Sequence, residues 1–144
     1  MPVDRATATV VIDAPVELVR EAVRDVTSQV DWVGEITGAE LLEEYEDGTA
    51  ATARFEMTTR LGVDRYTLEY EHADDAMSWV MGVGGMQKAQ TGAYRLRDLG
   101  DGRTQVTLDL EVEHSIAAPG FLRRKILQGV VEGNLASLRT YLEG

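Results

Sequence analysis

The chain has 144 residues, the usual size of one domain, and we expect a single domain over residues 1–144. Hydrophobic residues make up 44% and charged residues 27% of the sequence, which is typical of a globular protein rather than a disordered one. The 14 basic and 25 acidic side chains give a net charge of −11, so the surface as a whole repels nucleic-acid phosphates and anionic lipid headgroups. We therefore expect no nucleic acid as a partner.

Features that the sequence lacks exclude further classes of protein and of functional site. The sequence contains no cysteine, which excludes disulfides, thiol catalysis and thiolate metal sites. No apolar run approaches the roughly 20 residues of a transmembrane helix, so we expect no transmembrane segment. The first residues contain no apolar export segment, so we expect a cytoplasmic protein. No zinc spacing, phosphate loop or nucleotide motif is visible, and we expect neither a metal nor a cofactor.

In chain order, the first expected element is a strand over residues 6–12, which contain a β-branched run. Pro15 suits the first position of a helix whose apolar residues recur at helical spacing up to Val26. A short second helix or turn is expected over residues 28–32. Turn signals such as Asp47-Gly48 then separate segments of alternating polarity. These segments predict strands at 36–46, 50–59, 63–73, 77–83, 88–98 and 103–113.

Short connections between these strands predict an antiparallel meander. After Pro119, apolar residues at helical spacing predict a helix of about 24 residues, roughly 36 Å long and able to cross a whole sheet. In the last strand, apolar residues 106, 108, 110 and 112 alternate with polar ones, so one sheet face is dry and the other wet. We expect the long helix to cover the dry face.

A strongly curved sheet wrapped on one helix leaves an internal space, which dry-face side chains would line. The candidate cavity residues are Phe55, Met57, Tyr66, Leu68, Trp79, Met81, Tyr94, Leu108, Leu110, Ile126, Gly129 and Val130. Tyr70 and Leu96 share the same predicted face. The tyrosines and Trp79 would stack on a ligand ring and hydrogen-bond to a carbonyl, or else simply fill the core.

Three loops share one rim of the meander by strand polarity and would form the cavity mouth. The candidate mouth residues are Leu61, Gly62, Gly84, Gly85, Met86 and His114. The glycines of residues 82–85 favour a flexible gate, with a plain hairpin turn as the alternative. Gly129 and Gly133 either leave room for a ligand or allow a close approach of helix and sheet.

Candidate catalytic groups are few. His72 and His114 end strands of opposite direction, so we expect no shared site. Five charged residues on central strands are expected to face outward and to form cross-strand pairs: Arg54, Glu56, Arg65, Glu69 and Arg95. The basic cluster at residues 123–125 either forms a solvated helix face or attracts an anionic ligand headgroup or partner.

Two segments then carry a resemblance. Residues 11–19, Val-Ile-Asp-Ala-Pro-Val-Glu-Leu-Val, and Asp25 followed by Asp31-Trp32, together with the C-terminal helix, resemble the START-like or Bet v 1-like superfamily. Polyketide cyclases/dehydrases and coenzyme Q-binding proteins belong to it. One departure is Val30, where the family often has proline. The resemblance implies an α+β helix-grip fold, in which a curved seven-stranded antiparallel sheet wraps a long C-terminal helix and two short helices follow the first strand.

The resemblance also implies a cavity for an apolar small molecule. Our first hypothesis is a binding protein for a lipid, quinone or polyketide-like compound, because no inward acid–base pair is visible. The alternative is a polyketide aromatase/cyclase or dehydratase that uses Tyr66, Tyr94, Trp79 and either Arg54 or His114 to polarise a carbonyl. A second alternative is a protein-interaction module, which the charged outer face argues against. The sequence predicts no oligomeric state.

Overall fold

The computed structural model describes residues 3–60, 62–114 and 117–144, and the side chain of His114 lies outside this description. The elements are β1 (Val3–Ile12), α1 (Val16–Arg24), a 3-10 turn (Val26–Ser28), α2 (Gln29–Trp32), β2 (Ile36–Glu44), β3 (Ala50–Thr59), β4 (Gly62–Ala73), β5 (Ala76–Met81), β6 (Gln87–Gly100), β7 (Arg103–His114) and α3 (Gly120–Glu143). The predicted order of elements is confirmed. The largest difference is β1, which begins three residues earlier than expected because it pairs with β7 up to Glu113.

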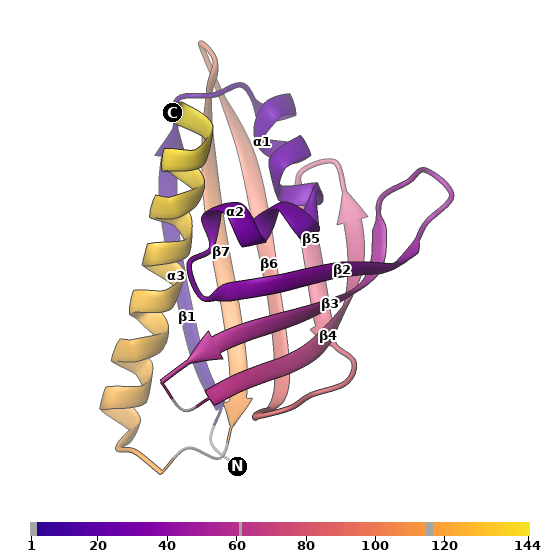
Figure 1. The fold of residues 1–144 in the computed structure, drawn as a ribbon. Coiled ribbons are helices and arrows are strands. Elements are labelled where there is room, and N and C mark those ends of the chain that lie inside the picture. The colour runs from indigo at the N-terminus through magenta and orange to yellow at the C-terminus, as the bar shows by residue number, and fades with distance from the viewer. Residues whose placement is uncertain (1–2, 61, 115–116) are drawn as a thin grey trace.

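The seven strands form one antiparallel sheet in the order β1-β7-β6-β5-β4-β3-β2. The strands β2 to β7 are thus a meander, as predicted, and β1 is added at the β7 edge. Figure 1 shows the β2–β3–β4 part turned strongly away from the direction of β1, β7 and β6. This is the helix-grip fold, with the two short helices between β1 and β2.

The predicted faces of the sheet are confirmed. Phe55, Tyr70 and Val106 belong to the buried core on the inner face. On the outer face, the arginines form the expected cross-strand ion pairs with neighbouring carboxylates: Arg54 with Glu40, Arg65 with Glu56 and Arg95 with Asp109. The alternation is therefore unbroken through the central strands, and the bulges lie near strand ends in β2 and β6.

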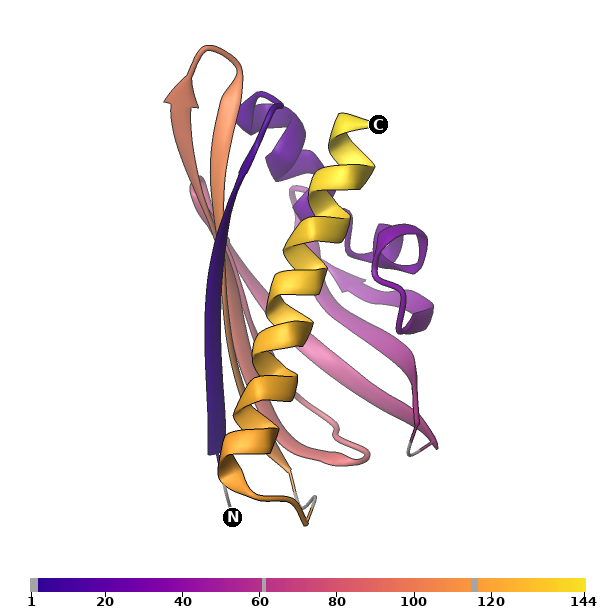
Figure 2. The same cartoon turned by 90° about the vertical axis from the view of Figure 1, so that its left-hand side faces the viewer.

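The position of α3 differs from the expectation that it crosses the dry face. It packs chiefly along β1, at the sheet edge, and only touches β7 and α2 (Figures 1 and 2). Three polar contacts tie it to that strand along its length: Arg123 Nε to Asp4 Oδ2 at 3.0 Å, Gln128 Nε2 to the Thr7 carbonyl at 2.9 Å, and Glu143 Oε2 to the Asp13 amide at 2.8 Å. The small inner-face side chains Ala6 and Ala8 of β1 allow this close approach.

The two halves of α3 are buried to different extents. Val131, Leu135 and Leu138 are fully buried in the core. Ile126 and Val130, which precede these residues in the helix and face another direction, keep 59% and 44% of their surface exposed. The inner face of the sheet is therefore closed beside the C-terminal half of α3 and open beside its N-terminal half. None of the helices that the structure describes is long and apolar enough to cross a membrane.

This difference between the two halves predicts different costs of truncation. We expect Leu138→Ala to lower the free energy of unfolding by about 2–5 kcal/mol, because it leaves a cavity in a packed core. We expect Ile126→Ala, the matched control on the open side, to cost less than about 1 kcal/mol. Urea denaturation of both variants measures the difference, and equal losses would contradict the packing of α3.

Candidate functional site

A cavity of about 320 Å³ lies between the inner face of the sheet, the N-terminal half of α3 and the segment from α2 to β2. Its surface is mostly apolar, with a few polar side chains at defined places. Because Ile126 and Val130 line it and are also exposed, the cavity opens to solvent beside α3. A hollow of this size and composition is typical of small-molecule sites.

The structure brings most of the predicted cavity residues together. The lining contains Met57, Tyr66, Leu68, Trp79, Tyr94, Leu108, Leu110, Ile126 and Val130. Three predicted residues lie elsewhere. Phe55 is buried against Tyr66, with ring centroids 5.8 Å apart; Met81 packs towards Gly84; and Gly129 faces solvent.

The predicted mouth residues that the structure describes, Gly62, Gly84, Gly85 and Met86, are not part of the cavity lining. A Cβ atom on Gly85 would lie 2.3 Å from Asp64 Oδ1, and the Met86 amide donates to the same oxygen at 2.8 Å. Gly84 is similarly close to the Gln87 carbonyl, so Gly84 and Gly85 allow close packing of a turn, in place of the flexible gate that we expected. Gly62, the exposed first residue of β4, has no described atom within 4 Å of a Cβ position, and its φ of +127° is one that favours glycine. Leu61 and the side chain of His114 lie outside the described residues.

Neither helix glycine has the role considered for it. A Cβ atom on Gly129 or Gly133 would have no atom within 4 Å among those described, and both residues are exposed. They neither make room for a ligand nor allow a close approach of helix and sheet.

The hydroxyl of Tyr70 is the notable polar group of the cavity. The residue keeps 1% of its surface exposed and lines the cavity. Its hydroxyl has no hydrogen-bond partner among the described residues, although its ring packs against His72 and Trp79. A buried hydroxyl without a partner costs about 1–3 kcal/mol, so a ligand atom that accepts this hydrogen bond would be stabilised.

Burial keeps the cavity tyrosines neutral. Desolvation raises the pKa of Tyr66 and Tyr70 well above the usual value, and the charge of Asp64 adds to the rise at Tyr66. Desolvation also raises the pKa of Tyr94, against a smaller opposing effect of its hydrogen bond to Asn134 Oδ1, at 2.5 Å. Tyr66 and Tyr70 therefore stay protonated, and able to donate a hydrogen bond, even at a pH where an exposed tyrosine ionises; the Tyr94 hydroxyl already donates within the protein.

A chain of side-chain hydrogen bonds along β6 was not foreseen. Trp79 Nε1 donates to Gln90 Oε1 at 2.8 Å, Gln90 Nε2 donates to Gln87 Oε1 at 2.7 Å, and Gln87 Nε2 donates to Asp64 Oδ2 at 3.2 Å. The indole lies over Gly92, where a Cβ atom would be only 2.3 Å from it. The sequence does contain a signal for this arrangement: in a strand whose side chains alternate between two faces, Gln90 and Gly92 lie on the same face as Tyr94.

The charged residues in the lining are Glu35, which is exposed, and Arg123. The Arg123 guanidinium is largely buried and lies 3.0 Å from the carboxylate of Asp4, which is more deeply buried. Its charge is thus compensated within the protein. Asn134, the other unforeseen polar residue, interrupts the apolar stripe of α3 between Val130 and Leu138.

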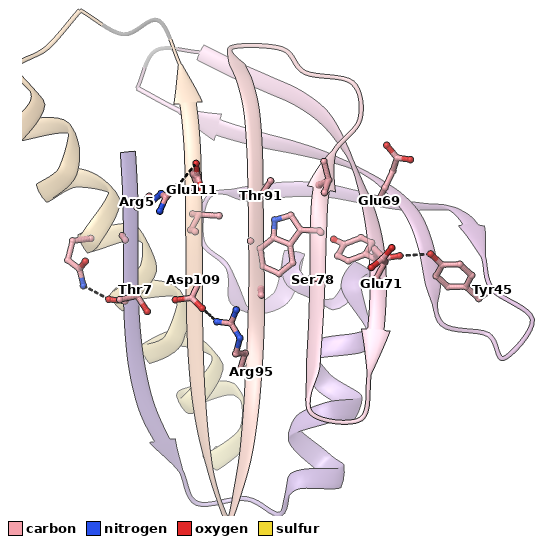
Figure 3. Close-up of a pocket in the computed structure, with 18 residues that line it drawn as sticks. Arg5, Thr7, Tyr45, Glu69, Glu71, Ser78, Thr91, Arg95, Asp109 and Glu111 are labelled. Carbon is pink, nitrogen blue, oxygen red and sulfur yellow. Dashed lines mark hydrogen bonds and ion pairs between the residues drawn. The ribbon is translucent and has the colours of Figure 1, made fainter. Parts of the chain in front are cut away.

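A second hollow, of about 1050 Å³, lies on the outer face of the sheet (Figure 3). Its charged side chains are largely exposed, and several already pair with each other, as in Arg5 with Glu111 at 3.3 Å and Arg95 with Asp109. Tyr45 closes one end and donates to the Tyr70 carbonyl at 2.5 Å. Because it is wide, open and lined by paired charges, this hollow is a weaker candidate than the inner cavity.

The two histidines do not share a site. His72 Nε2 lies 2.7 Å from the carbonyl oxygen of Ala50 and therefore donates to it. The backbone of His114 pairs with Gln87 at the opposite end of the sheet. The predicted separation of the two residues is confirmed for their backbone positions.

The raised tyrosine pKa values predict a loss of stability in alkali. Above about pH 10, the unfolded chain releases phenolic protons that the folded protein keeps, so the free energy of unfolding falls as pH rises. Each of Tyr66, Tyr70 and Tyr94 contributes up to about 1.4 kcal/mol per pH unit. Urea unfolding between pH 9 and 11 measures the slope, and we expect Tyr70→Phe to make it shallower. Tyrosinate absorbance from these three rings near pH 10 in a folded protein would contradict their burial.

The solved structures that resemble this chain share its fold. A START superfamily protein from Mycobacterium smegmatis is 21% identical, with a TM-score of 0.89 and coverage of 96% of this chain and 97% of that one. The Zhui aromatase/cyclase from Streptomyces is 20% identical, with a TM-score of 0.78 and coverage of 98% and 92%. A STAR-related lipid transfer protein from Xanthomonas axonopodis is 18% identical, with a TM-score of 0.71 and coverage of 96% and 85%. At these identities the likeness shows the fold alone.

Comparison of the sequence with protein families is more specific. No curated protein sequence matches the chain. The model of the family described as "Polyketide cyclase / dehydrase and lipid transport" matches residues 4–143. Since this match spans almost the whole chain, from the start of β1 to the end of α3, the protein belongs to the polyketide cyclase/dehydrase and lipid transport family.

Proposed function

We propose that the protein binds an uncharged, largely apolar small molecule, of the lipid, quinone or polyketide-like kind, in the cavity between the sheet and α3. The observation that carries this proposal is the buried, unpartnered hydroxyl of Tyr70 in an apolar cavity. An acceptor oxygen of the ligand, such as a carbonyl, would receive this hydrogen bond. Family membership supports the class of ligand.

The charges of the cavity support an uncharged ligand. A carboxylate or phosphate headgroup would need a cation, and the only cation in the described lining, Arg123, is held by Asp4. Separating this pair would remove the guanidinium from a buried carboxylate, and breaking a buried ion pair costs about 3–5 kcal/mol. A ketone, quinone or ester needs only the neutral donor at Tyr70.

Three naphthalene probes of similar shape test the proposal. We expect 2-acetylnaphthalene to bind about tenfold more tightly than 2-ethylnaphthalene, which lacks the acceptor, and 2-naphthoate to bind most weakly. Tyr70→Phe should abolish the preference for the ketone and keep the binding of 2-ethylnaphthalene, whereas the exposed Tyr141→Phe control should keep the preference. Dissociation constants from calorimetry or fluorescence measure this, and equal affinity of wild type for ketone and hydrocarbon would contradict the role of Tyr70.

A second candidate is an aromatase/cyclase or dehydratase. It is favoured by the two neutral tyrosines of the cavity that are not committed to a described partner, because such donors polarise the carbonyl of a poly-β-keto chain. Two residues considered for this chemistry do not support it. Arg54 faces outward in an ion pair with Glu40, and the Tyr94 hydroxyl is bound to Asn134.

Turnover decides between the two candidates. An enzyme would release a cyclised or dehydrated product from a poly-β-ketone, and Tyr66→Phe together with Tyr70→Phe would lower its kcat by at least about 100-fold. Chromatography of the products from wild type and the double variant measures this. Unchanged substrate with wild type, despite binding, supports a carrier; unchanged kcat in the double variant removes the proposed donors.

The interaction-module alternative has the least support, because the described outer face carries exposed, paired charges. The cytoplasmic location expected from the sequence stays a prediction, which cell fractionation would check.

A further inference from the structure

One end of the molecule differs in composition from the rest. Here β1 begins, β3 turns into β4, β5 turns into β6, and α3 begins, at the lower end in Figures 1 and 2. We call this end the basic rim, and define it by four exposed apolar and four exposed basic side chains: Val63, Val83, Met86 and Phe121, and Arg60, Lys88, Arg124 and Lys125.

The apolar side chains of the rim are unusually exposed. Phe121 and Val83 keep 70% and 67% of their surface in contact with solvent, more than any other large hydrophobic residue described. They lie at the tips of two different segments, the first turn of α3 and the β5–β6 connection. Single exposed apolar residues are normal, but a group of them at one end of a molecule marks an interaction surface.

The charges of the rim oppose those of the whole chain. The four basic side chains include both lysines of the sequence, and none of them forms an ion pair with another residue in the described part of the chain. The nearby aspartates are buried and already engaged: Asp4 holds Arg123, and Asp64 accepts from the Met86 amide and from Gln87. With Asp4 compensated by Arg123, the four basic side chains outnumber the other described carboxylates near this end, which are Asp64, Glu35 and Glu113. A protein of net charge −11 therefore presents an end with an excess of positive charge.

We propose that the basic rim docks on the surface of a bilayer that contains anionic lipids. Phe121 and Val83 would enter the interface between headgroups and acyl chains, while the four basic side chains contact lipid phosphates, as in amphipathic segments that bind membrane surfaces. The acidic far end does not prevent this. At physiological salt, charges are screened over about 8 Å, and α3 alone separates the two ends by roughly 36 Å.

Docking in this orientation would bring the cavity opening close to the bilayer. The opening lies beside Ile126 and Val130, roughly one and a half to two and a half turns along α3 from Phe121. An apolar ligand would then pass between bilayer and cavity along an apolar helix face, with little exposure to water. Docking itself goes beyond the ligand-binding proposal and does not depend on it.

Vesicle co-sedimentation tests the proposal without any ligand. We expect the wild-type protein to bind vesicles of phosphatidylcholine with 30% phosphatidylglycerol, and to bind pure phosphatidylcholine vesicles much more weakly. Neutralising two basic side chains, in Arg124→Gln with Lys125→Gln, should lower the partition coefficient about 30-fold, as should raising the salt to several hundred millimolar. Val83→Ser with Phe121→Ser should lower it at least about tenfold.

Matched controls lie away from the rim. Arg97→Gln with Arg103→Gln removes two exposed arginines from the opposite end of the sheet, and Val80→Ser removes an exposed valine from the outer face. Neither should reduce vesicle binding, and thermal unfolding would show that each variant is folded.

Several outcomes would overturn the proposal. These are no binding to anionic vesicles, equal losses in rim and control variants, or equal binding to a soluble polyanion such as heparin with no loss in the serine variant. A dimer that dissociates on Phe121→Ser, without vesicle binding, would assign the rim to a second copy of the chain. If the protein binds the naphthalene probes but no vesicles, the docking proposal fails while the ligand-binding proposal stands.

Discussion

The structure depends on the close packing of α3 against β1 at one edge of a strongly curved sheet. Ala6 and Ala8 present only methyl groups to the helix, and polar contacts near both ends and in the middle hold it along the strand. Because the helix lies at the edge, one long element cannot fill the space in front of β3 to β6. The buried leucines in its C-terminal half anchor the fold, while its N-terminal half becomes one wall of an open cavity.

This arrangement also explains why polar groups lie in the cavity without destabilising it excessively. The Trp79, Gln90, Gln87 and Asp64 side chains satisfy one another in sequence, and Tyr94 is satisfied by Asn134. Such networks are tolerated when each member has a partner. The fully buried hydroxyl of Tyr70 has no described partner, and a protein that keeps a buried donor unpaired carries a cost that a ligand would offset.

Much of the fold could be predicted from the sequence because alternation and turn chemistry are local signals. Tyr66, Leu68 and Trp79 were placed on the inner face by parity alone, and the register through the central strands has no bulge that would reverse it. The lateral position of α3 could not be predicted, because it depends on the curvature of the sheet and on which strand offers small side chains. The mouth was misplaced for the same reason.

The partners of individual side chains also could not be predicted from the sequence. Gly84 and Gly85 were interpreted as a source of flexibility, whereas the structure requires them for close contact with Gln87 and Asp64. Asp64 lies on another strand, and nothing in the sequence pattern indicates either contact. Gln90 and Asn134 were not among the candidate residues, because nothing in the sequence pattern indicates a partner for either amide. Their partners, Trp79 and Tyr94, belong to other elements, so only the folded chain shows that these amides are buried for a reason.

Net charge was the least informative of the global quantities. The value of −11 led to the expectation that anionic lipids are repelled, yet it averages over a molecule several screening lengths long. What an approaching surface experiences is the charge within about 8 Å of it. At the basic rim this charge comes mainly from four exposed basic side chains, while Arg123 compensates Asp4. The ion pair of Asp4 with Arg123 therefore affects both surfaces: it compensates the one cation of the described cavity lining, and it occupies the buried carboxylate of β1 so that the exposed basic side chains of the rim act outward.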